Sequence, residues 1–132
     1  MIVIASTELK NKDKIEFTMN KGNFHKIDNL IYIEVCYGEY NVGEYGKDLD
    51  EDTDTNKFYY MSAMGAYFPV SDLEAARDYY TLLRDYFTKC DEDEVFAKNS
   101  ESYREMREKA RCFGNTIEEI KTLNEKFLKI NK

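Results

Sequence analysis

The chain has 132 residues and a formal net charge of −7, with 42% apolar and 14% aromatic residues. This length suits one domain around one hydrophobic core. The apolar content excludes the disordered class, in which too few hydrophobic residues oppose chain entropy. Its uncharged apolar stretches reach only about ten residues, too short to cross a bilayer. The N-terminus lacks the basic segment of a secretory signal.

The three cysteines, Cys36, Cys90 and Cys112, are far apart and form no CxxC or Cys/His motif. This pattern is typical of reduced thiols in a cytoplasmic protein rather than of disulfides. It also lacks the paired spacing of a structural zinc site. We therefore expect a single cytoplasmic domain, residues 1–132, without a metal or cofactor.

Residues 1–68 carry the strand signals. Residues 1–5 predict a first strand, residues 14–19 alternate apolar and polar side chains, residues 20–23 predict a turn, and residues 24–27 predict the returning strand. Residues 30–37 predict a central strand, because both of their faces are largely apolar. The triplet Gly-Glu-Tyr occurs twice between positions 38 and 46, which indicates a turn or a bulge. An aromatic strand is predicted at 58–64, with an extension to 68.

Residues 69–132 carry the helix signals. Ser71 and Glu74 form a capping box, and a helix with an apolar stripe at steps of three and four follows: Leu73, Ala76, Tyr80, Leu83, Phe87 and Cys90. Further apolar residues, Tyr79, Leu82 and Tyr86, widen the stripe. The helix therefore either packs on two sides or exposes aromatic residues, on which a homodimer would be built.

Two further helical segments are predicted after this helix. Asp91 and Glu94 are candidate caps for the first, which residues 99–102 interrupt and Gly114 ends. Thr116 and Glu119 form a second capping box before the last. Strands followed by helices indicate an α+β fold. We expect an antiparallel sheet of four to five strands with two to three helices packed on one face.

The negative charge is concentrated between residues 47 and 95, which hold 13 acidic and five basic residues, a net charge of −8. Such a field steers a basic partner toward the protein, and tyrosines nearby are typical of binding surfaces. The alternative is that the acids only keep the protein soluble and the tyrosines belong to the core. The candidate partner-binding residues are Asp48, Asp50, Glu51, Asp52, Asp54, Tyr59, Asp72, Asp78, Tyr79, Asp85 and Tyr86.

The sequence offers no catalytic motif. The segment from Asp48 resembles a calcium loop but has Thr53 where an EF-hand needs glycine and Tyr59 where it needs glutamate. His25, the single histidine, has no nucleophile beside it in sequence. Nucleotide-binding and hydrolase motifs are missing, so the sequence favours a non-enzymatic role. A carboxylate pair with catalytic function stays open.

Direct nucleic-acid binding is disfavoured, because the basic residues of the tail are interleaved with glutamates; they are Arg104, Arg107, Lys109 and Arg111. The leading hypothesis is an acidic protein-binding module that docks on a basic surface of another protein, such as a nucleic-acid-binding protein. One version is an inhibitor that mimics nucleic-acid charge, as small phage-type inhibitors of bacterial defence nucleases do. The alternative is a small-ligand-binding protein or minor enzyme with a pocket between sheet and helices, lined by Tyr32, Tyr37, Tyr60 and Tyr67.

Overall fold

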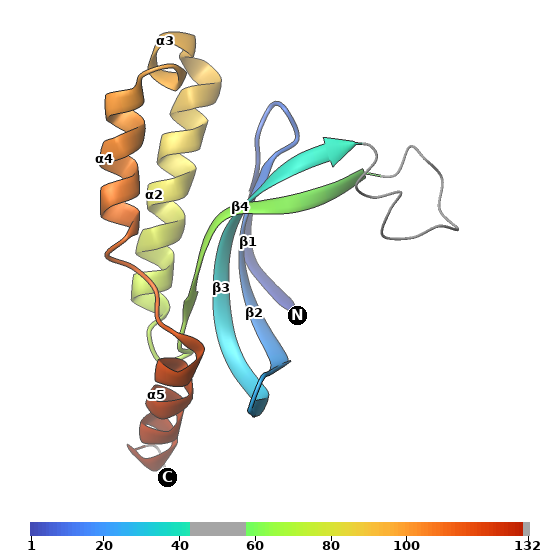
Figure 1. Cartoon of the computed structure of the whole chain (residues 1–132), viewed down its shortest axis with the longest axis vertical. Helices are drawn as coiled ribbons and strands as arrows, with labels where there is room; N and C mark the ends of the chain where they lie inside the picture. Colours follow the sequence, from blue (N-terminus) through green and yellow to red (C-terminus); the bar gives the residue numbers. More distant parts are fainter. Residues whose placement is uncertain (43–57, 131–132) are drawn as a thin grey trace.

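The computed structural model describes residues 1–42 and 58–130. Four strands form an antiparallel sheet in the order β1-β2-β3-β4, with bounds β1 (Ile2–Glu8), β2 (Lys14–Phe24), β3 (Ile27–Val42) and β4 (Phe58–Phe68). The helices follow, α2 (Leu73–Glu92), α3 (Glu94–Ala97), α4 (Ser100–Ala110) and α5 (Ile117–Ile130). The predicted α+β fold, with strands before helices, is confirmed (Figure 1).

The central strand is β3, which lies between β2 and β4 as predicted. Its residues Ile33, Val35 and Tyr37 are at most 9% exposed and belong to the same core cluster as Ala76 and Leu83 of α2. Successive side chains of a strand point to opposite faces, so the residues between them lie on the face away from α2. The sheet therefore has one face covered by α2 and a second, more polar face.

The β2–β3 turn lies at His25 and Lys26 rather than at the predicted residues 20–23. Phe24 pairs with Ile27 across this turn, and Lys26 takes a positive φ of 73°. The Asn-Lys-Gly-Asn segment instead extends β2, because its backbone pairs with that of β3. The first Gly-Glu-Tyr triplet forms no bulge of its own, because Gly38, Glu39 and Tyr40 each pair with one residue of β4; the register shifts beside Gly38, and the extra residue there is Ala63 of β4. The second triplet lies outside the described residues.

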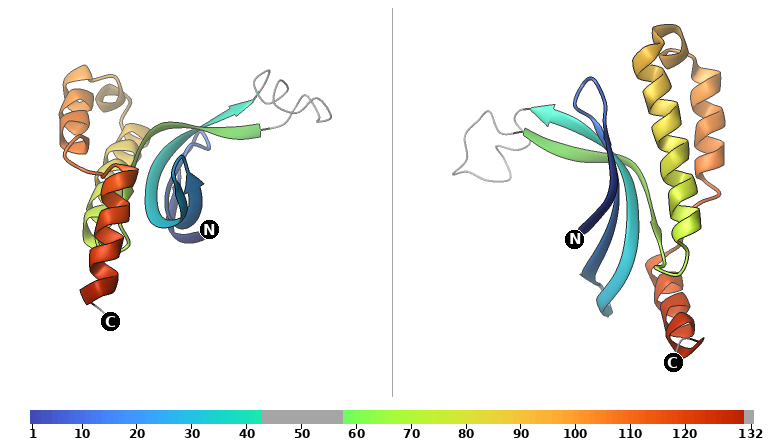
Figure 2. Two further views of the ribbon diagram at one scale, coloured as in Figure 1. Left: turned by 60° about the horizontal axis from the view of Figure 1, so that its bottom comes forward. Right: turned by 180° about the vertical axis from the view of Figure 1, so that it is seen from behind.

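Helix α2 packs on two sides within its own chain. Ala76, Tyr80 and Leu83 face the sheet, whereas Tyr79 contacts Phe113 and Tyr86 contacts Tyr103 on the side of α4. Figure 2 shows α2 and α4 as a helical hairpin beside the curved sheet. The aromatic stripe on which the homodimer hypothesis rested is thus largely covered by this chain's own elements.

The helix caps differ from the predictions in two of three cases. Asp72 rather than Ser71 caps α2, because its side chain accepts a hydrogen bond from the Ala75 amide, and Asp93 rather than Asp91 caps α3. The Thr116–Glu119 capping box before α5 is confirmed in both directions. The Thr116 amide donates to Glu119 Oε1 at 3.0 Å, and the Glu119 amide donates to Thr116 Oγ1 at 3.1 Å.

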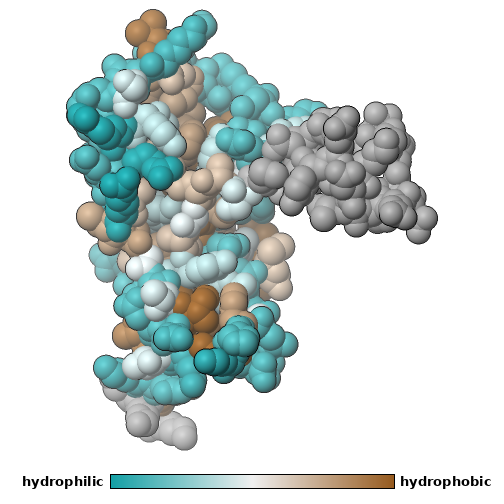
Figure 3. All heavy atoms as spheres, in the orientation of Figure 1, coloured by the Kyte–Doolittle hydropathy of each residue, from teal (hydrophilic) through white to brown (hydrophobic). Residues whose placement is uncertain are grey.

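Helix α5 packs on a separate, smaller cluster at the end of the β2–β3 hairpin. Ile120 is fully buried there against Ile27 and Leu30, and Asn124 Nδ2 donates to the Ile31 carbonyl at 2.9 Å. Figure 3 shows apolar residues gathered between α5 and this hairpin. Because few residues attach α5 to the sheet, its stability depends on local interactions.

Candidate docking surface and pockets

The structure describes only part of the predicted partner-binding set, and it does not test partner binding. Asp48, Asp50, Glu51, Asp52 and Asp54 lie outside the described residues. Tyr59 lies in β4, where it pairs with Asn41 of β3. Figure 1 shows the end of β3 and the start of β4, on either side of residues 43–57, leading away from α2.

Three predicted residues of the helical half have roles inside the fold. Tyr79 is 2% exposed between Phe68 and Phe113, so it belongs to the core and not to a docking surface. Asp72 caps α2. Tyr86 is half-buried among aromatic rings that include Phe96, and burial raises its pKa to about 12. Tyr79 and Tyr86 therefore support the packing of the helical hairpin.

Asp78 and Asp85 remain as exposed acids on α2, and the structure places them in a longer row. A helix turns by about 100° per residue, so Glu74, Asp78, Asp85 and Glu92 fall within about 40° of one another. All four are exposed, on the side of α2 opposite the residues that pack on the sheet. We call these four residues the acidic row.

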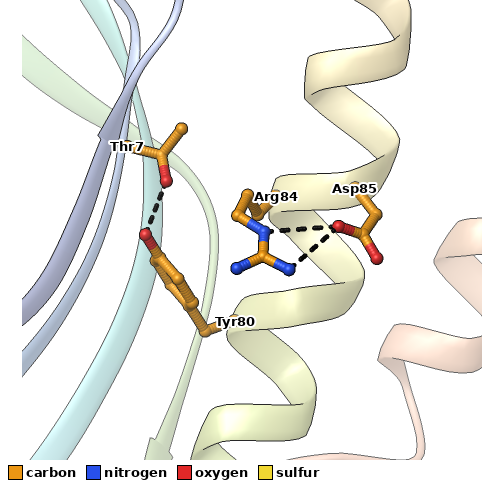
Figure 4. Close-up of polar contacts among 4 residues, drawn as sticks. All are labelled: Thr7, Tyr80, Arg84 and Asp85. Carbon is orange, nitrogen blue, oxygen red and sulfur yellow. Dashed lines mark hydrogen bonds and ion pairs between the residues drawn. The ribbon is translucent and has the colours of Figure 1, made fainter.

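Only one member of the acidic row is paired with a base in the described part of the chain. Arg84 contacts Asp85 Oδ1 at 3.2 Å, while the neighbouring Tyr80 points to Thr7 of β1 (Figure 4). The ion pairs of the described residues include no contact to Glu74, Asp78 or Glu92. The partner-binding residues predicted from the sequence did not include Glu74 and Glu92. Glu74 lies four residues before Asp78 and Glu92 lies seven residues after Asp85, and these helical spacings would have identified both.

The predicted tyrosine-lined pocket does not form from the residues that the structure describes. Tyr37 lies in the core, stacked on Phe87 with ring centroids 3.9 Å apart. Tyr32 and Tyr67 contact each other on the opposite sheet face, where Phe24 joins them. Tyr32 and Tyr37 are five residues apart on one strand, and an odd spacing places side chains on opposite faces.

The sheet face away from α2 holds a polar hollow of about 160 Å³, lined by Glu16, Glu34, Cys36 and Ser62 among others. Cys36 Sγ lies 3.0 Å from Ser62 Oγ. Burial, with a smaller contribution from the two glutamates, raises the pKa of the Cys36 thiol. A thiolate is the reactive form of cysteine, so this environment disfavours nucleophilic chemistry at Cys36.

Other chemistry finds little support in the described ranges. No three or more His, Cys, Asp or Glu side chains gather there as metal ligands, and His25 lies exposed at the β2–β3 turn. Among the same residues, no helix combines the length and apolar character that a membrane span requires.

The fold and surface together define an α+β protein with a four-stranded antiparallel meander and a row of exposed acids along α2. Comparison with known proteins found no matching family model, curated protein or solved structure.

Proposed function

We propose that this protein is a non-enzymatic docking module that binds a basic surface of another protein. The supporting observation is the acidic row on α2, in which Glu74, Asp78 and Glu92 are exposed and have no basic partner among the described residues. Complementary charge raises association rates and selects partners. The free thiols Cys36, Cys90 and Cys112 fit a cytoplasmic location.

The charge density of the row limits what it can imitate. Its first and last carboxylates are 18 residue steps apart, which is about 27 Å of helix at 1.5 Å per residue. One DNA strand carries a phosphate about every 3.4 Å, or roughly eight over that length. The row alone therefore suits a few lysines or arginines of a partner protein. Nucleic-acid mimicry, including phage-type inhibition of a nuclease, additionally requires the acids Asp48, Asp50, Glu51, Asp52 and Asp54.

The test uses this chain as bait in a native cell extract. A variant with Glu74→Gln, Asp78→Asn and Glu92→Gln removes the three unpaired charges of the row. Exposed ion pairs contribute about 0.2–1 kcal/mol each, so the variant should bind its partner roughly tenfold more weakly at low salt. The loss should shrink as salt screens the charges of the wild type.

The control carries the same change in net charge elsewhere on the surface. It combines Glu105→Gln and Glu108→Gln on α4 with Glu125→Gln on α5, all exposed, and should retain binding. Undiminished capture by the row variant would reject the row as the docking surface. Equal losses in both variants would reject a localised site in favour of net charge.

The nucleic-acid-mimic version has a separate test. Neutralising Asp48, Asp50, Asp52 and Asp54 together should weaken capture further if the partner holds nucleic acid, and DNA should compete with the protein for that partner. A captured partner that binds DNA without competition would restrict the proposal to ordinary protein docking.

A further inference from the structure

A pocket of about 300 Å³ lies between α4 and the edge strand β4, away from the acidic row. Its polar lining residues are Tyr79 of α2 with Arg107 and Arg111, which stand one helical turn apart at the end of α4. Its apolar wall includes Met64 and Phe113. We call it the arginine pocket.

The arginine pocket is positively charged, whereas the chain as a whole is negatively charged. The whole chain carries −7, yet no carboxylate belongs to the residues that line this pocket. Arg104, one turn earlier on α4, is paired with Glu101. In contrast, the ion pairs of the described residues leave Arg107 and Arg111 without an acidic partner.

Tyr103 holds the Arg107 side chain in place and leaves most of the N–H donors of Arg107 available. Its Nη1 donates to the Tyr103 hydroxyl at 3.3 Å, and its guanidinium lies 5.8 Å from the centroid of that ring. A guanidinium has five N–H donors in a planar fork that matches a carboxylate or phosphate. Arg107 is therefore oriented and retains donors for an anion.

Tyr79 supplies the second observation. Its side chain is 98% buried, since only 2% is exposed, and it lines the arginine pocket. Within the described residues its recorded contacts are ring contacts with Phe68 and Phe113, and no hydrogen bond reaches its hydroxyl. Among the described residues only Asn124 Oδ1 is a fully enclosed side-chain polar atom without a partner, so the Tyr79 hydroxyl opens onto the pocket, where a bound ligand oxygen can accept its hydrogen bond.

We propose that the arginine pocket binds a small organic anion. A carboxylate or phosphate group of the ligand contacts Arg107, Arg111 and the Tyr79 hydroxyl, and its apolar part packs against Met64 and Phe113. Charge-assisted hydrogen bonds to a planar anion are the strongest of these interactions. This site is independent of the docking function proposed above.

The experiment is an NMR titration of the isotope-labelled full chain with inorganic phosphate and, separately, with benzoate. Binding of either should shift the amide signals of residues 63–65 and 107–113 at concentrations up to about 10 mM. Tighter binding of benzoate would identify a carboxylate ligand with an apolar body, and tighter binding of phosphate would identify a phosphorylated one. If neither probe shifts these signals, the proposal is wrong.

Three variants separate an anion site from a structural role of the arginines. Arg107→Gln should weaken binding roughly tenfold or more, because it removes a charged donor. Tyr79→Phe keeps the ring contacts and should weaken binding about fivefold, the equivalent of one neutral hydrogen bond. Arg104→Gln is the matched control and should leave binding unchanged. A wild-type affinity in Arg107→Gln, or an equal loss in Arg104→Gln, would overturn the assignment.

Discussion

At the scale of single residues, the buried carboxylate of Asp13 joins two parts of the fold. It is 6% exposed and accepts hydrogen bonds from the Tyr37 hydroxyl at 2.6 Å, the Tyr40 amide at 2.8 Å and Asn11 Nδ2 at 2.9 Å. A buried charge is stable only when hydrogen bonds replace its hydration. Asp13 thereby ties the β1–β2 connection to β3.

Replacement of Tyr37 by phenylalanine tests this link. The variant keeps the stacking on Phe87 but removes one donor to a buried carboxylate, so the free energy of unfolding should fall by about 1.5–3 kcal/mol. Urea denaturation measures the loss. Tyr103→Phe is the control: Tyr103 is 40% exposed, and its substitution should change stability by less than about 0.5 kcal/mol. Similar effects of the two changes would contradict the role of Asp13.

Gly114 is a second residue with a specific structural requirement. Its φ is +98°, and an added Cβ would lie 3.0 Å from the Cβ of Ala66 in β4. Gly114→Ala should therefore destabilise the fold by about 1–3 kcal/mol, since both the backbone conformation and the contact oppose a side chain. Thermal denaturation is the readout. Gly22→Ala, where the nearest atoms lie at 3.4 Å, should cost much less.

At the scale of elements, the capping box at the start of α5 forms in both directions and should stabilise this helix. Thr116→Ala removes the hydroxyl that accepts from the Glu119 amide, and loss of such a cap costs about 1 kcal/mol. Hydrogen exchange of the α5 amides should accelerate roughly fivefold. Thr122→Ala, in the middle of the same helix, should leave exchange unchanged or slower because alanine favours helix. Equal acceleration in both variants would rule out the cap as the cause.

The elements also show where local sequence signals succeed and fail. The Thr116–Glu119 box was predictable because capping depends on residues only three positions apart. The turn was misplaced at residues 20–23 because Asn and Gly are common turn residues, whereas pairing with β3 extends β2 through them. Asp72 was overlooked as a cap because Ser71 beside it satisfies the same sequence rule.

At the scale of the whole molecule, the buried tyrosines predict alkaline instability. Burial raises the pKa of Tyr79 and of Tyr86 to about 12, above the value of about 10 in unfolded chains. Between these values the folded state holds more protons than the unfolded state, so the free energy of unfolding falls as pH rises. This contribution is complete below about pH 10 and is lost toward pH 12.

Urea denaturation between about pH 8 and pH 11.5 measures this effect. The wild type should lose stability steeply above pH 10. Tyr79→Phe, which has no group to ionise at this position, should lose less over the same interval. Identical pH profiles of the two proteins would show that Tyr79 does not carry the dependence.

The sequence by itself determined the α+β class, the order of strands and helices, the wide apolar face of α2 and the exposure of Asp78 and Asp85. These features follow from periodicity within one element, where residues two to four positions apart share a face. Only the tertiary structure decided that Tyr79 is buried, that Tyr32 and Tyr37 lie on opposite sheet faces, and that Arg107 and Arg111 line a pocket with β4. These features depend on strand register and on packing between segments distant in sequence, which local patterns do not encode.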